Sequence, residues 1–189
     1  MEAFLVSIGL GALAEFGDRT QLLVLVLAVK FRRPIPIILG ILVATLVNHA
    51  LAGATGVWIT SLINPAVMRW VLGISIYAMG VWILIPKKIN QEENPPPRFG
   101  AFLTTSVAFF LLEIGDKAQI ATIALAANYN DMVAVVAGTT AGIMLANVPV
   151  VLFGDVMAKK LPMALAQGIA ALIFFLLGTF VLLGFSTLF

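Results

Sequence analysis

Six long apolar segments, separated by short polar stretches, limit what this chain can fold into. The segments span approximately residues 3–29, 35–61, 66–85, 100–127, 132–157 and 163–186. A helix needs about 20 apolar residues to cross a bilayer, so each segment is long enough to do so. Transmembrane barrel strands alternate apolar and polar residues, whereas these runs are continuous. We therefore predict an all-α, polytopic membrane protein with six transmembrane helices.

The composition excludes several other classes of protein. Hydrophobic residues make up 61% and charged residues 11% of the 189 residues, against about 45–50% and about 25% in soluble domains. Six membrane helices leave only short loops, so we expect neither a soluble catalytic domain nor enzymatic activity, and no cofactor. The chain has no cysteine, which excludes thiolate metal sites. Its single histidine, His49, cannot form a histidine-rich metal site alone.

The positions of the basic residues predict the orientation in the membrane. Eight lie after the first, third and fifth apolar segments: Lys30, Arg32, Arg33, Lys87, Lys88, Arg98, Lys159 and Lys160. The opposite side has only Arg69, near a helix end. The positive-inside rule then places these three stretches in the cytoplasm and both termini outside the cell (inner) membrane. We interpret the basic residues as topology signals, with the lipid bilayer and not a nucleic acid as partner. The oligomeric state stays open.

The two halves of the chain repeat each other at an offset of 98 residues. The motif Glu15, Gly17, Asp18, Arg19 and Gln21 aligns with Glu113, Gly115, Asp116, Lys117 and Gln119. A match of so many polar residues is not expected by chance in an apolar chain. We predict one three-helix repeat in residues 1–85, a cytoplasmic linker in 86–99 and a second repeat in 100–189. Because each repeat has an odd number of spans, the second is inverted, as in many secondary transporters.

Each repeat thus carries a charged motif in the middle of its first apolar segment. We expect one continuous helix through each motif, and at about 100° per residue its two carboxylates lie one turn apart on one polar face. A charge at the centre of a membrane helix costs about 2.5–3.5 kcal/mol, so these groups must face one another or water. Four carboxylates and two basic residues leave a charge of −2, which one divalent cation or two protons would neutralise. This equivalence is the minimum that exchange of a metal ion for protons needs.

Oxygen ligands of this kind suit Mg²⁺, Ca²⁺ and Mn²⁺. The predicted metal ligands are Glu15, Asp18, Gln21, Glu113, Asp116 and Gln119, with Arg19 and Lys117 as charge-balancing groups. Candidates for secondary ligands or proton carriers are Asn48, His49 and Asn147. These three residues and the two glutamines have an alternative role in hydrogen bonds between helices. A purely structural alternative for the motifs pairs Glu15 with Arg19, and Glu113 with Lys117, as ion pairs within one helix.

The doubled motif resembles that of the GDT-type family of cation/proton exchangers, which includes bacterial manganese exporters of the MneA type and Golgi manganese/calcium transporters. The resemblance covers essentially the whole chain. It implies export of a divalent cation, Mn²⁺ before Ca²⁺, with the two glutamates and two aspartates of the motifs binding the ion. Ala118 departs from the family pattern, which has Thr or Ser at that place, as Thr20 has in the first half.

Two other functions fit part of the sequence. A passive divalent-cation channel would also use rings of acidic residues. An intramembrane aspartyl protease would use the Gly-Asp pairs, but the adjacent Lys or Arg would keep each aspartate ionised and unable to share a proton. Na⁺ is an alternative to the proton as coupling ion. Exchange of a metal ion for protons is the function that uses both motifs completely.

Overall fold

The computed structural model describes residues 1–62, 64–85, 100–160 and 163–183, without the side chains of residues 19, 65–66, 155–160 and 163–166. These parts of the chain form helices and no strand, which confirms the predicted all-α class. The helices are α1 (Glu2–Glu15), α2 (Arg19–Phe31), α3 (Pro34–Thr60), α4 (Pro65–Ile83), α5 (Gly100–Glu113), α6 (Lys117–Tyr129), α7 (Met132–Lys160) and α8 (Met163–Leu182). The predicted linker 86–99 lies outside the described residues.

The first apolar segment of each half is broken into two helices, so the expectation of a continuous helix through the motif is wrong. In the first half, α1 ends at Glu15 and α2 begins only at Arg19. Gly17 and Gly115 have φ angles of 72° and 71°, a left-handed conformation that glycine adopts without steric penalty. Asp18 is extended and occupies the N-cap position of α2. The two carboxylates of a motif therefore leave from the ends of two helices, and not from one helix face.

The backbone of the second half follows that of the first at the same spacing as the motifs. Corresponding helices begin at residues 2 and 100, 19 and 117, 34 and 132, and 65 and 163, which are all 98 residues apart. Both α2 and α6 have 13 residues and end in a left-handed residue, Arg32 with φ 51° and Asn130 with φ 50°. A positive φ is uncommon outside glycine, so its recurrence shows that the two halves share local backbone detail.

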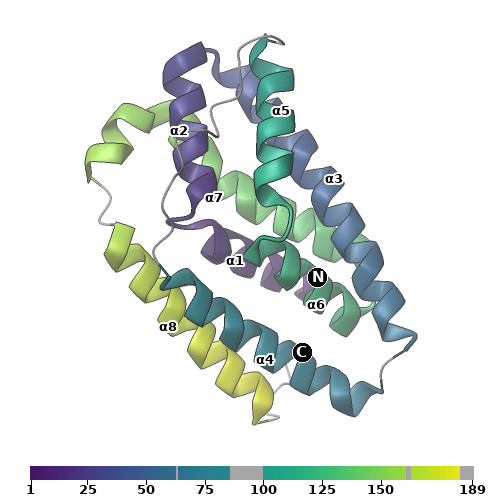
Figure 1. Cartoon of the computed structure of the whole chain (residues 1–189). Coiled ribbons are helices and arrows are strands. Elements are labelled where there is room, and N and C mark those ends of the chain that lie inside the picture. The colour runs from purple at the N-terminus through teal and green to yellow at the C-terminus, as the bar shows by residue number, and fades with distance from the viewer. Residues whose placement is uncertain (63, 86–99, 161–162, 184–189) are drawn as a thin grey trace.

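Most of the packing joins one half to the other. α1 packs on α7, α5 on α3 and α4 on α8 (Figure 1). A Cβ atom on Gly40 of α3 would lie 2.8 Å from the carbonyl oxygen of Phe102 on α5, and one on Gly138 of α7 would meet the carbonyl oxygen of Phe4 on α1. Gly138 lies 98 residues after Gly40, and Phe102 lies 98 residues after Phe4. The second contact is therefore the first with the two halves exchanged. Such reciprocity is the property of an isologous interface.

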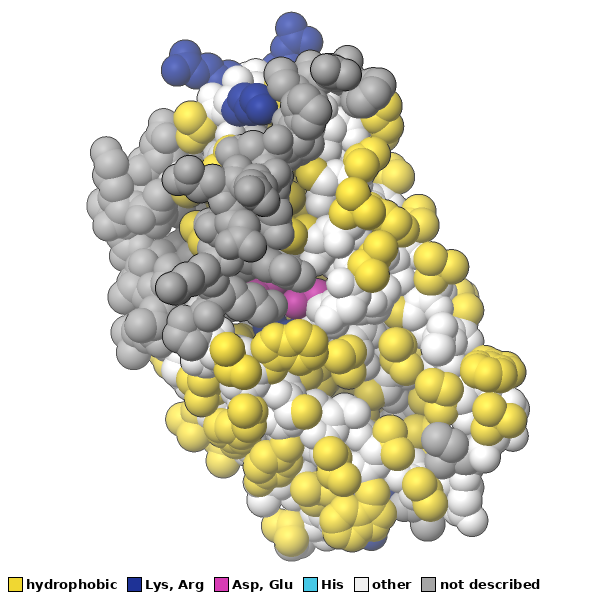
Figure 2. All heavy atoms as spheres, viewed as in Figure 1, with side chains coloured by type: hydrophobic (Ala, Val, Ile, Leu, Met, Phe, Trp, Pro, Cys, Tyr) yellow, Lys and Arg dark blue, Asp and Glu magenta, His cyan; other side chains and the backbone are white. Residues whose placement is uncertain are grey.

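The outside of the molecule is that of a membrane protein. By length and composition, Pro34–Thr60 and Met132–Gly154 could each cross a bilayer, with mean hydropathies of 2.1 and 1.8. Shorter apolar helices accompany them. Figure 2 shows hydrophobic side chains spread over the visible face, with Lys and Arg gathered mainly at one end. A surface with so many exposed large apolar side chains is unusual for a soluble monomer, and a lipid environment suits it.

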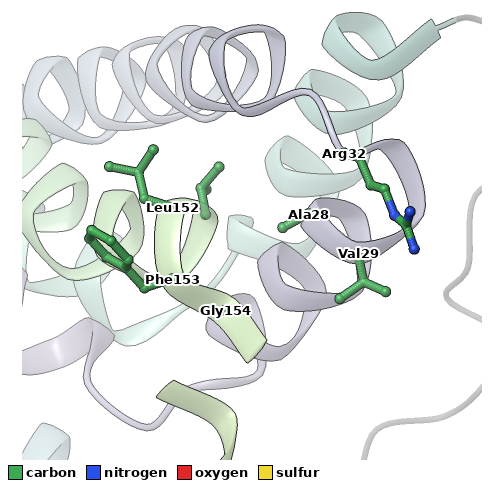
Figure 3. A pocket seen from close by; sticks show the side chains of 7 residues that line it. Ala28, Val29, Arg32, Leu152, Phe153 and Gly154 are labelled. Carbon is green, nitrogen blue, oxygen red and sulfur yellow. The ribbon is translucent and has the colours of Figure 1, made fainter. Parts of the chain in front are cut away.

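One pocket of about 400 Å³ lies between the end of α2 and α7, away from both motifs (Figure 3). Its lining is mainly apolar: Ala28, Val29, Arg32, Val151, Leu152, Phe153 and Gly154. Phe153 has non-helical angles (φ −126°, ψ 22°) and marks a kink within α7. Among the side chains that the structure describes, none of the predicted site residues lines this pocket.

Candidate metal-binding site

The two helix breaks lie against each other. α2 contacts α5 and α1 contacts α6, so that the halves cross at their motifs (Figure 1). Glu15, Asp18, Glu113 and Asp116 are all buried. In Figure 2, acidic side chains are visible at one place on this face, about midway along the molecule. The fold has therefore brought the four motif carboxylates, from both halves, into one buried region.

A lysine from the second half connects two of these carboxylates. Nζ of Lys117 lies 2.8 Å from Oδ1 of Asp18 and 4.0 Å from Oδ1 of Asp116, and all three residues are buried. Aspartate is favoured at an N-cap because its side chain usually binds the first backbone N–H groups. Asp18 and Asp116 both occupy N-cap positions, but neither side chain makes that bond. Their carboxylates are directed at other partners instead.

In the second half, this geometry argues against the purely structural alternative of an ion pair between Glu113 and Lys117 within one helix. Lys117 pairs with Asp18 of the opposite half, 99 residues away in the chain, and not with Glu113 four residues before it. The helix break is the physical reason, because residues i and i+4 face each other only in a continuous helix. The side chain of Arg19 lies outside the described residues.

The motif glutamates each meet a polar residue of the opposite half. Asn147 on α7 donates from Nδ2 to Oε1 of Glu15 at 2.8 Å, and also to the carbonyl oxygen of Ile143 at 3.1 Å. His49, the counterpart of Asn147 on α3, places Nε2 3.4 Å from Oε1 of Glu113. Both contacts thus join equivalent positions with the halves exchanged.

Two further side chains on α3 approach Glu113. Asn48 donates from Nδ2 to Oε2 of Glu113 at 3.3 Å and to the carbonyl oxygen of Phe110 at 3.0 Å. Thr45 donates from Oγ1 to Oε1 of Glu113 at 3.4 Å. The three secondary residues predicted from the sequence, Asn48, His49 and Asn147, therefore all contact a motif glutamate between helices.

The two glutamines close the helix breaks. Oε1 of Gln21 accepts a hydrogen bond of 3.0 Å from the backbone N–H of Gly17, and Oε1 of Gln119 accepts one of 2.7 Å from Gly115. Nε2 of Gln21 also donates to the carbonyl oxygen of Ala146 at 3.3 Å. A backbone N–H released from a helix needs such a partner where no water reaches it, so the glutamines stabilise the positive-φ turns. Each carbonyl oxygen retains a second lone pair.

Several buried oxygens around the motifs have no hydrogen-bond partner among the described residues. They include Oε2 of Glu15, Oγ1 of Thr20, Oδ1 of Asn48 and Oδ1 of Asn147. Native interiors pair nearly all such atoms, because an unpaired buried polar group is unfavourable. Carboxylate, hydroxyl and amide oxygens are also the ligands of hard divalent cations. The donor set around the motifs fits such an ion.

The carboxylates share a region without meeting at one point. Within the ranges that the structure describes, no three Asp, Glu or His side chains are close enough together to hold one metal ion. Lys117 lies between the two aspartates, and the two glutamates are each hydrogen-bonded to the opposite half. Bringing the carboxylates onto one ion would require a local rearrangement of these side chains.

Sequence reasoning missed three residues that support the site. Thr45 contacts Glu113, Thr122 contacts His49, and Gln167 on α8 donates from Nε2 to the carbonyl oxygen of Gly17 at 2.7 Å. Thr45 lies one helical turn before His49, so its spacing on α3 was a usable signal. Nothing in the sequence marks the other two, because their roles depend on which helices pack together.

Comparison with known proteins adds evidence independent of this geometry. The family model described as "Divalent cation/proton antiporter GDT1" matches residues 3–91 and 101–187. A Vibrio cholerae serotype O1 protein named "Putative manganese exporter" is 47% identical over 190 residues, which cover 100% of this chain and 92% of that protein. No solved structure matches the chain.

Proposed function

The chain belongs to the GDT1 family of divalent cation/proton antiporters, and from this premise we propose that it exports Mn²⁺ across the cell (inner) membrane in exchange for protons. The metal ion is then a transported substrate and not a cofactor. The name of the Vibrio relative supports manganese as the main substrate, and Ca²⁺ is the second ion that an oxygen-rich site accepts. The family is one of transporters, which argues against the intramembrane protease considered above.

The observation that carries this proposal is the buried group of charges that Lys117 connects. In this arrangement its ammonium group lies between Asp18 and Asp116, where a metal ion would also be attracted. We propose that the transported ion displaces Lys117 and binds both aspartates together with Glu15 and Glu113. Gln21 and Gln119 keep the two turns in shape and offer their remaining lone pairs. Arg19 and Lys117 balance the charge.

Charge neutrality then couples the metal ion to protons. The four carboxylates and two basic groups together carry −2, so that one divalent cation or two protons neutralise them equally well. A buried site with uncompensated charge is unfavourable in a low-dielectric interior. The protein would therefore change between its inward-open and outward-open conformations only when the site holds a metal ion or protons.

We further propose six transmembrane spans in two inverted repeats, residues 1–85 and 100–189, with the linker 86–99 in the cytoplasm and both termini outside. Contacts that recur with the two halves exchanged support this arrangement, as does the clustering of basic residues between alternate segments. In transporters of this architecture, discontinuous helices form the ion site, and the two repeats move against each other.

Transport into proteoliposomes tests this function. The purified protein is reconstituted with a pH-sensitive dye inside the vesicles, and Mn²⁺ or Ca²⁺ is added outside. We expect the metal to enter while protons leave, and an imposed pH gradient to drive the metal uphill. Metal entry that neither moves protons nor responds to a pH gradient would identify a passive channel. No transport of either metal would overturn the proposal.

A matched pair of variants on α1 supplies the control. Glu15→Gln removes a buried motif carboxylate, whereas Glu2→Gln removes an exposed one at the start of the same helix. We expect the first to abolish metal-driven proton movement and the second to leave it unchanged. Equal activity of both variants would show that transport does not depend on the motif carboxylate of Glu15.

A further inference from the structure

His49 on α3 is completely buried, and both of its ring nitrogens face polar atoms of the second half. Nδ1 lies 2.6 Å from Oγ1 of Thr122 on α6, and Nε2 lies 3.4 Å from Oε1 of Glu113 on α5. The positions of the hydrogens decide what each nitrogen offers to its neighbour.

Thr122 favours one tautomer of this histidine. Its hydroxyl donates to the carbonyl oxygen of Ala118 at 2.9 Å, which leaves an oxygen lone pair to accept a hydrogen bond from Nδ1 of His49. In the tautomer with its hydrogen on Nδ1, the lone pair of Nε2 faces Glu113. Histidines that bind a metal ion through one nitrogen are typically held by an acceptor at the other nitrogen in this way.

Nε2 of His49 and Oε1 of Glu113 are then two acceptors that face each other in a buried place. A cation bound to both atoms removes the repulsion between their lone pairs. Two ligands at right angles on an ion with bonds of about 2.1 Å are about 3.0 Å apart, so these two atoms are close to a chelating separation. Asn48 adds a third possible metal ligand. Its Nδ2 donates to the carbonyl oxygen of Phe110, whereas its buried Oδ1 has no hydrogen-bond partner among the residues that the structure describes.

The first half offers no equivalent nitrogen ligand. Asn147, which lies 98 residues after His49, donates an amide hydrogen to Glu15, and only its oxygen could bind a metal ion. His49 is the single histidine of the chain, which also has no cysteine. The site around the motifs therefore contains one imidazole, and its other neutral and acidic ligands are oxygens.

We propose that His49 is a nitrogen ligand of the transported ion and selects first-row transition-metal ions over Ca²⁺ and Mg²⁺. An all-oxygen site suits Ca²⁺, Mg²⁺ and Mn²⁺ alike, whereas an imidazole ligand favours transition-metal ions. This inference rests on the proposed function and deepens it, because it assigns the choice between metals to one residue of one half.

Pulsed electron paramagnetic resonance of bound Mn²⁺ tests the ligand directly. We expect the purified wild-type protein loaded with Mn²⁺ to show echo modulation from a directly bound imidazole ¹⁴N, and His49→Gln to lack it. With one histidine in the chain, the assignment is unambiguous. Bound Mn²⁺ without this modulation in the wild type would overturn the inference and leave the proposed function standing. A wild type that neither binds nor transports Mn²⁺ would overturn both.

Transport by variants tests selectivity. His49→Gln is expected to lower kcat/KM for Mn²⁺ about tenfold or more, the order found when metal-site support is removed, and to change that for Ca²⁺ less than twofold. Thr122→Val, which releases Nδ1, is expected to shift the ratio in the same direction. Thr139→Val is the matched control, because Thr139 is also buried and bonded to its own helix backbone but is not bonded to His49. Equal loss for both metals in His49→Gln, or an unchanged ratio in both His49→Gln and Thr122→Val, would overturn the inference.

Discussion

Lys117 on α6 and Asp18 at the start of α2 form a buried ion pair between the two halves, with 2.8 Å from Nζ to Oδ1. The pair joins one helix break to the other and places a positive charge among the motif carboxylates. Such a pair contributes little net stability when intact, but its disruption leaves an uncompensated buried charge. The consequences of removing each partner therefore differ in a way that can be measured.

Replacing the lysine alone is expected to destabilise the protein strongly. Lys117→Gln leaves the buried carboxylate of Asp18 without its ammonium partner, a loss of about 3–5 kcal/mol in comparable pairs. Thermal unfolding in detergent is expected to show a lower Tm, and addition of Asp18→Asn is expected to recover much of the loss. Lys30→Gln, at an exposed position on α2, is the control and is expected to leave Tm unchanged. An unaltered Tm in Lys117→Gln would mean that the pair is not formed.

The same lysine is expected to influence pH dependence more than metal selectivity. Without its positive charge, protons compete more strongly with the metal ion for the carboxylates. Half-maximal Mn²⁺ transport by Lys117→Gln should therefore move to higher pH, while the ratio of Mn²⁺ to Ca²⁺ transport stays the same. Proteoliposome assays at a series of pH values measure both. A pH profile identical to that of the wild type would show that Lys117 does not affect the competition between protons and the metal ion.

If both halves form a single metal site, a variant in either half should lose transport to the same extent. Asp18→Asn and Asp116→Asn should each abolish metal-driven proton exchange, because ligands of one coordination shell do not act additively. Isothermal titration calorimetry on Asp18→Asn should detect no Mn²⁺ binding. Retention of half the bound metal would instead show two independent sites, one in each half.

The two motif glycines should tolerate alanine to different degrees. Both need a positive φ, which is less favourable by about 1–2 kcal/mol for a residue with a Cβ atom. A Cβ on Gly17 would also lie 2.7 Å from Cγ of Gln167, whereas one on Gly115 would have no atom of the described residues within 4 Å. Gly17→Ala should therefore lower Tm more than Gly115→Ala. Gly168→Ala, on α8, should not lower it, because its Cβ would meet no atom of the described residues within 4 Å. The reverse order would show that the break at Gly17 is not held as described.

The orientation of the protein in the membrane can be determined by labelling cysteines introduced at the two ends of α3. The chain contains no native cysteine, and Arg33 and Ser61 are exposed on either side of this helix. A membrane-impermeant maleimide added to intact cells should label Ser61→Cys, and should label Arg33→Cys only after permeabilisation. The opposite pattern would reverse the assigned topology.

Much of the fold follows from local properties that the sequence carries. The predicted segment 35–61 and the observed α3, Pro34–Thr60, differ by one residue at each end, because hydropathy and the flanking residues define such a helix. The 98-residue repeat of the motifs likewise reappears in the starts of the helices. The sequence also predicted which polar residues lie in the buried region, because a charge in an apolar segment must find a partner or water.

The sequence by itself thus determined the helical membrane class, the duplication and the set of polar residues around the motifs, whereas only the tertiary structure decided how those residues meet. An isolated glycine in a helix costs about 1 kcal/mol, too little to predict that the chain breaks at Gly17. The break is stabilised only when Gln21 binds the released N–H and Gln167 binds the carbonyl. Lys117 similarly pairs with Asp18 across the molecule, and not with Glu113 nearby in the chain. Electrostatic and hydrogen-bond energies depend on separation in space, and that separation is set by the packing of one half against the other.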